Sequence, residues 1–329
     1  MKLKTASLFH WLLIVLLEVN AAVGDDWIVS GYLPDYRFYI NVNATAAIGL
    51  TDLILFSLEP PSLSGCCLHQ DNHWPIAQQA VAFSQERTSN SLKLWLTVGG
   101  AGRSMGFRQL FGENKGKAFM EKLIVFARRH RLTGIDFDCE LPFSQQEYYQ
   151  YMLFLQFACI ELHKAGLLVS VALHPKQTIT KTLAVLLDRV HLMAYDFPGL
   201  PYHSDLPRVK QTVQFLLKNG LSANKIVLGI PAYGRHPTNP NLVKTYAELV
   251  DELDSKITEN TNSIHGIKFD SPRVIHQKVE YAIEQGLAGV FVWELGQDKV
   301  VPLAPRGIVL ESIHQRLDRN KESQTFDEL

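Results

Sequence analysis

Short runs of apolar and β-branched residues recur along the chain, and most are followed by turn residues and then by a stretch with helical spacing. Eight of these runs are apolar enough to be buried on both faces, as the strands of a parallel sheet are. We therefore predict eight strands. They lie at residues 27–32, 53–58, 92–98, 134–140, 167–173, 190–194, 226–230 and 288–292.

Between several of the runs, apolar residues are spaced by three and four positions, which predicts amphipathic crossover helices. These helices are expected at 117–131, 145–165, 209–219 and 272–285, with a shorter one at 183–187. Strands that alternate with helices in this number predict a single (β/α)₈ TIM barrel. A doubly wound open sheet is the alternative, but we find no Gly-rich phosphate loop of the kind such sheets carry.

We expect the barrel to occupy residues 25–317 as one α/β domain with little or no insertion domain. The interval between the runs at 226–230 and 288–292 is polar, and a long loop with one or two helices fits it better than an independent fold. Residues 318–329 are strongly polar and are expected to form a loose C-terminal tail.

Composition agrees with a large globular domain. The chain has 329 residues, of which 47% are hydrophobic, and a barrel of ~250 residues or more would absorb nearly all of it. A formal net charge of −1, from 32 basic and 33 acidic residues, argues against nucleic-acid binding and attraction to an anionic membrane. None of the four cysteines has zinc-finger spacing. Cys139 is expected to be a packed free thiol, and the adjacent Cys66 and Cys67 have no assignable partner.

The beginning of the chain has the pattern of a secretory signal peptide, which we place at residues 1–24. Lys2 and Lys4 precede an apolar run at 8–17, and small residues follow it. The run is too short for a membrane anchor, which needs ~20 residues, so no membrane insertion is expected after the signal is removed.

Two further features suit the secretory pathway. Asn43-Ala-Thr45 is a glycosylation sequon. The chain ends in Phe326-Asp-Glu-Leu329, which resembles the tetrapeptides that retrieve proteins to the endoplasmic reticulum. The protein is therefore expected to be secreted, or held in the endoplasmic reticulum lumen if this ending works as a retrieval signal.

Three carboxylates stand at alternate positions, Asp136, Asp138 and Glu140, in the fourth predicted strand. Alternate side chains of a strand share a face, so the acids should point into the barrel while the apolar residues between them pack on helices. Active sites of such barrels lie at the carboxyl ends of the strands. Clustered acids raise one another's pKa, so we expect a raised pKa at Glu140, which is nearest the mouth and is suited to be a general acid.

Two simpler explanations of the acidic run are a solvated edge strand and a Ca²⁺ or Mg²⁺ site. The first does not account for the Tyr195-Asp196 pair and Trp293 elsewhere in the chain. The second is typical of an early strand in an open sheet, whereas this run is the fourth of eight. Acid/base catalysis is therefore favoured.

The run also carries a family resemblance. Thr133-Gly-Ile-Asp-Phe-Asp-Cys-Glu140 resembles the D-G-x-D-x-D-x-E signature of the family 18 glycoside hydrolases, the chitinase family. Segments similar to other strands of that family follow in order. They are Ser30-Gly-Tyr-Leu-Pro-Asp-Tyr36 for the first strand, Leu94-Trp-Leu-Thr-Val-Gly-Gly100 for the S-x-G-G motif of the third, Met193-Ala-Tyr-Asp196 for the M-x-Y-D motif of the sixth, Leu228-Gly-Ile-Pro-Ala-Tyr-Gly234 for the seventh and Gly289-Val-Phe-Val-Trp293 for the eighth.

The resemblance implies a retaining mechanism in which the substrate's own 2-acetamido group is the nucleophile, an exception to the two-carboxylate rule. Glu140 would then be the general acid and later the base. Asp138 would orient the acetamide, and Asp136 would hold Asp138 through a shared proton. Tyr195 would bind the acetamide carbonyl. No metal or organic cofactor is implied.

The same resemblance implies a set of substrate-binding residues. Trp293 would form an apolar floor under the sugar, and Asp196 would help to position the acetamide. Gly99 and Gly100 would let the backbone approach the sugar closely. The remaining candidates for the lining of the cleft are Met193, Tyr32, Phe56 and Tyr233. Tyr32, Phe56 and Tyr233 are equally compatible with ordinary packing.

Two positions depart from the family pattern, Thr133 for the first Asp of the signature and Thr97 for Ser, but no acid is lost. The expected partner is an oligo- or polysaccharide that contains N-acetylglucosamine, with chitin or chito-oligosaccharides first. An endo-β-N-acetylglucosaminidase acting on N-glycan cores is an alternative, and a catalytically inactive chitinase-like lectin is another.

Overall fold

The computed structural model describes residues 27–37, 49–60, 92–111, 113–141, 143–199, 202–253 and 257–327. The signal-peptide segment, Asn43, Cys66, Cys67 and the last two residues of the chain lie outside this part, so the predictions made for them stay predictions. Of the other cysteines, Cys139 and Cys159 are buried free thiols.

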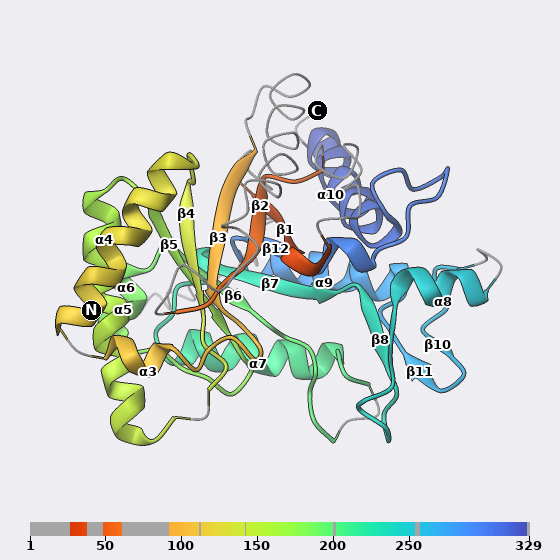
Figure 1. Ribbon diagram of the computed structural model, residues 1–329. Coiled ribbons are helices and arrows are strands. Elements are labelled where there is room, and N and C mark those ends of the chain that lie inside the picture. Colours follow the sequence, from red (N-terminus) through yellow and green to blue (C-terminus); the bar gives the residue numbers. More distant parts are fainter. Residues whose placement is uncertain are drawn as a thin grey trace, which may run out of the picture.

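The fold is a closed barrel of eight parallel strands surrounded by helices (Figure 1). The neighbours around the barrel are β1, β12, β7, β6, β5, β4, β3 and β2, in that order. The strands are β1 Ile28–Pro34, β2 Asp52–Leu58, β3 Lys93–Gly99, β4 Gly134–Asp138, β5 Leu168–Leu173, β6 Arg189–Leu192, β7 Ile226–Pro231 and β12 Gly289–Trp293. All eight predicted strands are confirmed, with ends that shift by a few residues at most.

The crossover helices are also confirmed. They are α4 Glu113–Arg129, α5 Gln145–Lys164, α6 Lys181–Leu186, α7 Leu206–Lys218 and α9 Pro272–Glu284. The short helix α3 Phe107–Leu110 was not predicted. Local sequence fixes where they begin. Ser144 and Glu147 form a capping box at the start of α5, and Asp205 and Ser271 cap α7 and α9, each just before a proline in the first turn.

The polar interval after β7 is not a plain loop. It forms a small antiparallel sheet of four strands in the order β10, β11, β8, β9, with helix α8 beside it (Figure 1). Its elements are β8 Tyr233–Arg235, β9 Val243–Thr245, α8 Tyr246–Glu252, β10 Ser263–Ile264 and β11 Ile267–Lys268. The expectation of a long loop was wrong in this respect, because strands of two or three residues are too short to give a visible alternation.

The expected loose tail is also corrected. Helix α10 spans Ile308–Asp327, so most of the polar segment after residue 317 continues a helix. The helical part of this segment has no Gly or Pro, the two residues that disfavour helix most, and it includes Arg319, Lys321, Glu322 and Gln324, which are good helix formers. Polarity alone therefore did not predict its conformation.

Two hydrophobic cores hold the barrel together. One lies between strands and helices and includes Ile135, Phe137 and Cys139. The other fills the barrel interior and is strongly aromatic. Its buried members are Ile28, Tyr32, Ile54, Phe56, Trp95, Tyr195, Val227, Tyr233 and Phe291. Within the described residues, no helix has both the length and the apolar character needed to cross a membrane.

Candidate active site

Strand β4 divides its side chains between the two cores as predicted. Asp136 and Asp138 are buried and point into the barrel, while Ile135 and Phe137 pack outward under the helices. Glu140 follows the end of the strand and is exposed at the mouth of the barrel. The three acids therefore rise from the interior to the rim along one edge of the site.

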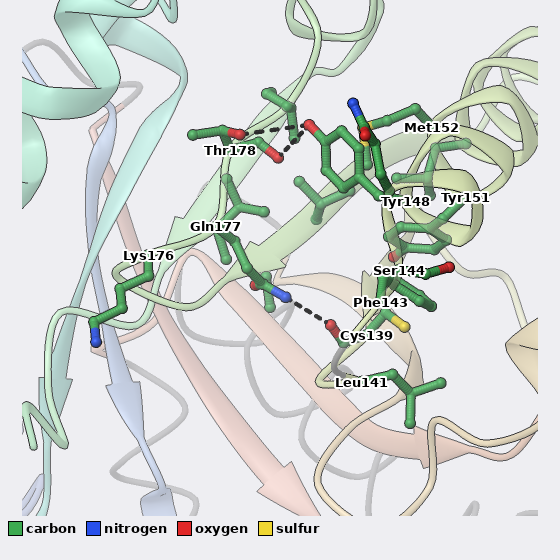
Figure 2. A pocket seen from close by; sticks show the side chains of 16 residues that line it. Cys139, Leu141, Phe143, Ser144, Tyr148, Tyr151, Met152, Lys176, Gln177 and Thr178 are labelled. Carbon is green, nitrogen blue, oxygen red and sulfur yellow. Dashed lines mark hydrogen bonds between the residues drawn. The ribbon is translucent and has the colours of Figure 1, made fainter.

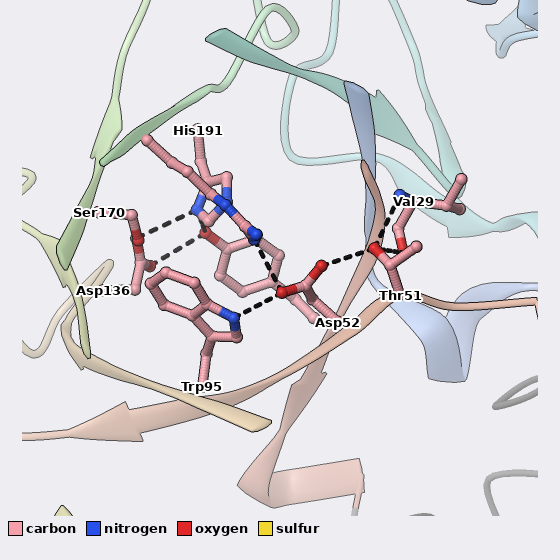
Figure 3. Close-up of polar contacts among 9 residues, drawn as sticks. Val29, Thr51, Asp52, Trp95, Asp136, Ser170 and His191 are labelled. Carbon is pink, nitrogen blue, oxygen red and sulfur yellow. Dashed lines mark hydrogen bonds and ion pairs between the residues drawn. The ribbon is translucent and has the colours of Figure 1, made fainter. Parts of the chain in front are cut away.

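Asp136, the deepest acid, is held by four side chains from four other strands, of which Ser170 and His191 are labelled in Figure 3. Its Oδ2 accepts from the Tyr32 hydroxyl at 3.0 Å and from the Thr97 hydroxyl at 3.0 Å. Its Oδ1 accepts from the Ser170 hydroxyl at 2.6 Å and lies 3.1 Å from His191 Nδ1. Burial opposes ionisation here, but the hydrogen bonds, that of His191 foremost, hold the pKa of Asp136 below its ordinary value.

Both oxygens of Asp136 accept hydrogen bonds from other side chains, and the proton that it was expected to share with Asp138 stays a prediction. Asp138 instead has a buried Oδ1 without a hydrogen-bond partner among the described residues. Burial, followed by repulsion from Glu140 and then Asp136, raises the pKa of Asp138 well above its ordinary value. Of the two buried acids, the lower is set up to be ionised and the upper to carry a proton.

Glu140 behaves as the sequence predicted. Burial of its carboxyl group, with added repulsion from Asp196, raises its pKa, while the backbone N–H of Ala101 opposes the shift. The side chain as a whole is nevertheless exposed, because it stands at the rim with its carboxyl directed to the pocket. A proton donor that reaches a cleft from a poorly solvated wall is suited to general acid catalysis.

Asp138 and Glu140 line a pocket of about 160 Å³ at the carboxyl ends of the strands. Most of the predicted site residues meet there. Its lining consists of Tyr32, Ala101, Asp138, Glu140, Ala172, His174, Met193, Tyr195, Asp196, Tyr233, Phe291 and Trp293. Trp293 packs against Tyr32 with 5.4 Å between ring centroids, which gives the pocket an apolar aromatic wall.

Three predicted binding residues do not line this pocket. Phe56 stands behind the wall, 4.9 Å from the Trp293 ring centroid. A Cβ on Gly99 would lie 2.0 Å from the Asp138 carbonyl oxygen, and one on Gly100 would lie 2.1 Å from the Phe56 ring. Both glycines have positive φ, so within the protein they serve a tight turn and close packing rather than open access to a ligand.

Tyr195 and Asp196 lie on the segment after β6. The Tyr195 hydroxyl is buried without a partner among the described residues, on a side chain that lines the pocket. Asp196 has a φ of 56°, a left-handed conformation that turns the chain at this point. Its carboxylate receives two hydrogen bonds from Arg235, at 2.8 and 2.9 Å, and lies 3.1 Å from His203 Nδ1. Burial alone would raise the pKa of Asp196, but the contacts with His203 and Arg235 lower it to about 2.

Arg235 and His203 were not singled out from the sequence. Arg235 ends β8, so the unpredicted small sheet supplies the cation that fixes Asp196. His203 directly precedes Ser204, whose hydroxyl accepts from the buried Lys278 that also pairs with Asp270. Both residues come from segments whose fold is set by tertiary contacts, and no local pattern points to them.

His191 and Ser170 were also missed, but a signal was available. Each lies on a predicted strand at a position that alternation places on the same face as the other inward residues of its strand. Polar residues facing a barrel interior need buried partners, and a nearby acid is the natural one. The part of the chain that the structure describes contains no group of three or more His, Cys, Asp or Glu side chains arranged to hold a metal ion.

A larger pocket of about 390 Å³ lies beside the site, between the segments that follow β4 and β5 (Figure 2). Tyr148 and Tyr151 form part of an aromatic wall, and Lys176 points away from it. Gln177 donates to the Cys139 carbonyl at 2.9 Å and so ties the two segments together. The lining of this pocket includes none of the three acids.

Comparison with known proteins shows which family the chain resembles. The family model described as glycosyl hydrolases family 18 matches residues 39–298. A probable chitinase 2 of Drosophila melanogaster is 24% identical over 279 residues, covering 65% of this chain and 57% of the relative. Chitinase 1 of Aphanocladium album is 25% identical over 288 residues, covering 68% and 67%. The chain thus spans little more than half to two thirds of the length of these relatives.

Solved structures agree in fold. A family 18 chitinase from the chitin utilization locus of Flavobacterium johnsoniae aligns with a TM-score of 0.76 at 24% identity, over 89% of this chain and 94% of that one. A family 18 chitinase from Cycas revoluta, in complex with allosamidin, aligns with a TM-score of 0.73 at 20% identity, over 88% and 99%. Because the family model matches well over half of its residues, this chain belongs to family 18 of the glycosyl hydrolases.

Proposed function

We propose that this protein is a retaining glycoside hydrolase that cleaves β-1,4 bonds next to N-acetylglucosamine, with chitin or chito-oligosaccharides as substrate. The observation that carries the proposal is the convergence of Glu140, Asp138, Tyr195 and Trp293 on one pocket. The similar proteins named as chitinases support the substrate class. A solved family 18 chitinase from Cycas revoluta in complex with three N-acetylglucosamine units supports it further.

In the first step the glycosidic C–O bond breaks. Glu140 gives its proton to the leaving oxygen, which takes the electron pair of the broken bond. The carbonyl oxygen of the substrate's 2-acetamido group forms a new bond to the anomeric carbon, which yields a cyclic oxazolinium ion. The raised pKa of Glu140 supports this role, since the group must be protonated when the substrate binds.

The acetamide needs two partners to attack from the right direction. Its N–H donates to a carboxyl oxygen of Asp138, which directs the acetamide carbonyl oxygen towards the anomeric carbon. Its carbonyl oxygen accepts from the Tyr195 hydroxyl, which has no hydrogen-bond partner among the described residues. Trp293 lies against the C–H face of the sugar.

The second step restores the enzyme. Water attacks the anomeric carbon, Glu140 takes a proton from that water, and the bond from carbon to the acetamide oxygen breaks. Two displacements at the same carbon return the original configuration, so the reaction is retaining. No protein side chain becomes covalently attached to the sugar.

Product analysis by mass spectrometry tests the proposal. The purified protein should cleave chitotetraose and leave cellotetraose intact, because only the first substrate has an acetamide nucleophile. A high-mannose glycoprotein in a parallel reaction identifies the alternative, cleavage of N-glycan cores. Binding of chitotetraose without cleavage of either substrate would point to a lectin, and efficient cleavage of cellotetraose would exclude the assisted mechanism.

A further inference from the structure

Strand β6 places two basic side chains inside the barrel, at alternate positions, and each contacts a buried acid (Figure 3). Arg189 donates to Asp52 Oδ1 at 2.8 Å, in a layer closed by Trp95, whose indole N–H donates to the same oxygen at 2.7 Å. His191 Nδ1 lies 3.1 Å from Asp136 Oδ1 in the next layer towards the mouth. The first pair forms the floor of the barrel, whereas the second supports the catalytic acids.

With Asp136 ionised, the contacts of His191 indicate which ring nitrogen carries hydrogen. Its Nδ1 is 2.9 Å from the Tyr32 oxygen as well as 3.1 Å from Asp136 Oδ1. The single hydrogen of the Tyr32 hydroxyl is directed to Asp136 Oδ2. An ionised carboxylate can only accept, so the hydrogen between the imidazole and Asp136 belongs to Nδ1. The other ring nitrogen, Nε2, is buried without a partner among the described residues.

Asp136 is the one acid that contacts the His191 ring among the described residues. Of the titratable groups packed on its ring, Tyr32 comes from β1 and Asp136 from β4. Trp95 of β3 and Phe291 of β12 face it with neutral rings, at 6.5 and 5.5 Å between centroids. Along its own strand the nearest charge is the guanidinium of Arg189, which is already paired with Asp52. His191 itself is fully buried.

We propose that His191 is a positioning residue of the active site, which acts through Asp136 by donating from Nδ1 and so keeps that carboxylate ionised beneath a protonated Asp138. A donor to Asp136 favours its charged form. Two neighbouring buried acids disfavour double ionisation, so the proton they retain is then carried by Asp138, the acid that faces the substrate. This inference rests on the proposed hydrolase function for its kinetic consequences, but not for the hydrogen bond itself.

The kinetic test compares two substitutions of His191. His191→Leu removes the donor, and His191→Asn restores a side-chain N–H at a similar reach. We expect His191→Leu to lower kcat for chitotetraose about tenfold or more with less than about a threefold change in KM, because the acids and not the sugar contacts are disturbed. The acid limb of the kcat/KM profile should move to higher pH by about one unit or more, because Asp136 loses a donor to its ionised form.

His191→Asn should recover most of the rate and return the acid limb towards that of the wild type. The matched control is His163→Asn, which breaks a histidine–carboxylate pair on the surface, where Nε2 lies 2.8 Å from Asp188. That variant should leave both kcat and the limb unchanged. A folded His191→Leu protein, verified by thermal unfolding, with an unmoved limb would overturn the proposal, as would a shifted limb that His191→Asn does not correct.

A second measurement does not depend on turnover. Nitrogen-15 spectra of the imidazole, assigned by the loss of its signals in His191→Asn, report which ring nitrogen carries hydrogen at neutral pH. Hydrogen on Nδ1 is the expected result, whether or not any glycan is cleaved. An imidazole protonated only on Nε2 would overturn the proposal even in an active enzyme, and an inactive wild type with Nδ1–H would instead contradict the hydrolase function alone.

Discussion

The Tyr195 hydroxyl and Asp138 Oδ1 are both buried, both without a hydrogen-bond partner among the described residues, and both on side chains that border the same pocket. A buried polar group left unpaired costs about 1–3 kcal/mol, so two in one place call for an explanation. A ligand with one acceptor and one donor at a short separation would satisfy both. An acetamide group has this pair, in its carbonyl oxygen and its N–H.

Tyr195→Phe is therefore expected to separate activity from stability. Within the described part of the chain the hydroxyl has no hydrogen-bond partner to lose, so the free energy of unfolding should stay the same or rise by about 1 kcal/mol. The kcat for chitotetraose should fall by roughly 10²-fold, since a donor to a charged intermediate is lost. Denaturant unfolding and steady-state kinetics measure the two effects. A large loss of stability would show that the hydroxyl has a structural partner.

Glu140→Gln should abolish most of the chemistry and spare binding. Loss of a general acid lowers kcat by about 10²–10⁴-fold, while an amide of the same shape leaves the pocket intact. Calorimetry with chitotetraose should give a dissociation constant within a few-fold of the KM of the wild type. Glu161→Gln on helix α5, where the carboxylate pairs with Lys164 at the surface, is the matched control and should keep full activity.

The alkaline side of the pH profile should be set by Glu140. Burial, reinforced by Asp196, raises the pKa of Glu140 above its ordinary value. The reaction needs the protonated acid, so activity is present below this pKa and declines as pH rises through it. Plots of kcat/KM against pH should show that decline on the acid side of neutrality or near it. In Asp196→Asn the decline should move to lower pH, because one source of repulsion is gone.

How much of this site the sequence predicts depends on how local each residue's placement is. Alternation in β4 is enough to send Asp136 inward and Phe137 outward, because a strand's pleat fixes both at once. The partners of Asp136 could not be paired from the sequence, since Tyr32 and His191 are brought to it by closure of the barrel, across 104 and 55 residues of chain. The position of Arg235 could not be predicted either, because its strand of three residues is too short to show an alternation of apolar and polar residues.

Acid should weaken the segment after β6 through Asp196. Burial alone would raise the pKa of Asp196, but its contacts with His203 and Arg235 have the larger effect and lower that pKa to about 2. A folded pKa below the ordinary value of 3.8 gives stability that is fully present above about pH 4 and is lost as pH falls towards 2. Unfolding curves for the wild type should show this loss, and those for Asp196→Asn should lack it. The carboxylate is 34% exposed, so the contribution should be modest.

Gly100→Ala should damage the aromatic wall from behind. An added methyl group would lie 2.1 Å from Phe56, the ring that packs 4.9 Å from Trp293, so Phe56 must move and Trp293 with it. Overpacking typically costs about 1–3 kcal/mol, and a left-handed φ adds about 1–2 kcal/mol for any residue with a Cβ. We expect a lower free energy of unfolding together with a higher KM for chitotetraose.

Gly102→Ala separates the effect of the left-handed backbone from the effect of the clash with Phe56. This glycine also has a positive φ, but a Cβ there would meet no atom within 4 Å. The free energy of unfolding should therefore fall only by the cost of the left-handed φ, about 1–2 kcal/mol, and KM should be unchanged. If both variants raise KM equally, the turn's backbone and not the stack of Phe56 on Trp293 controls sugar binding. If Gly100→Ala alone raises it, the stack that supports Trp293 is what keeps the wall in place for the substrate.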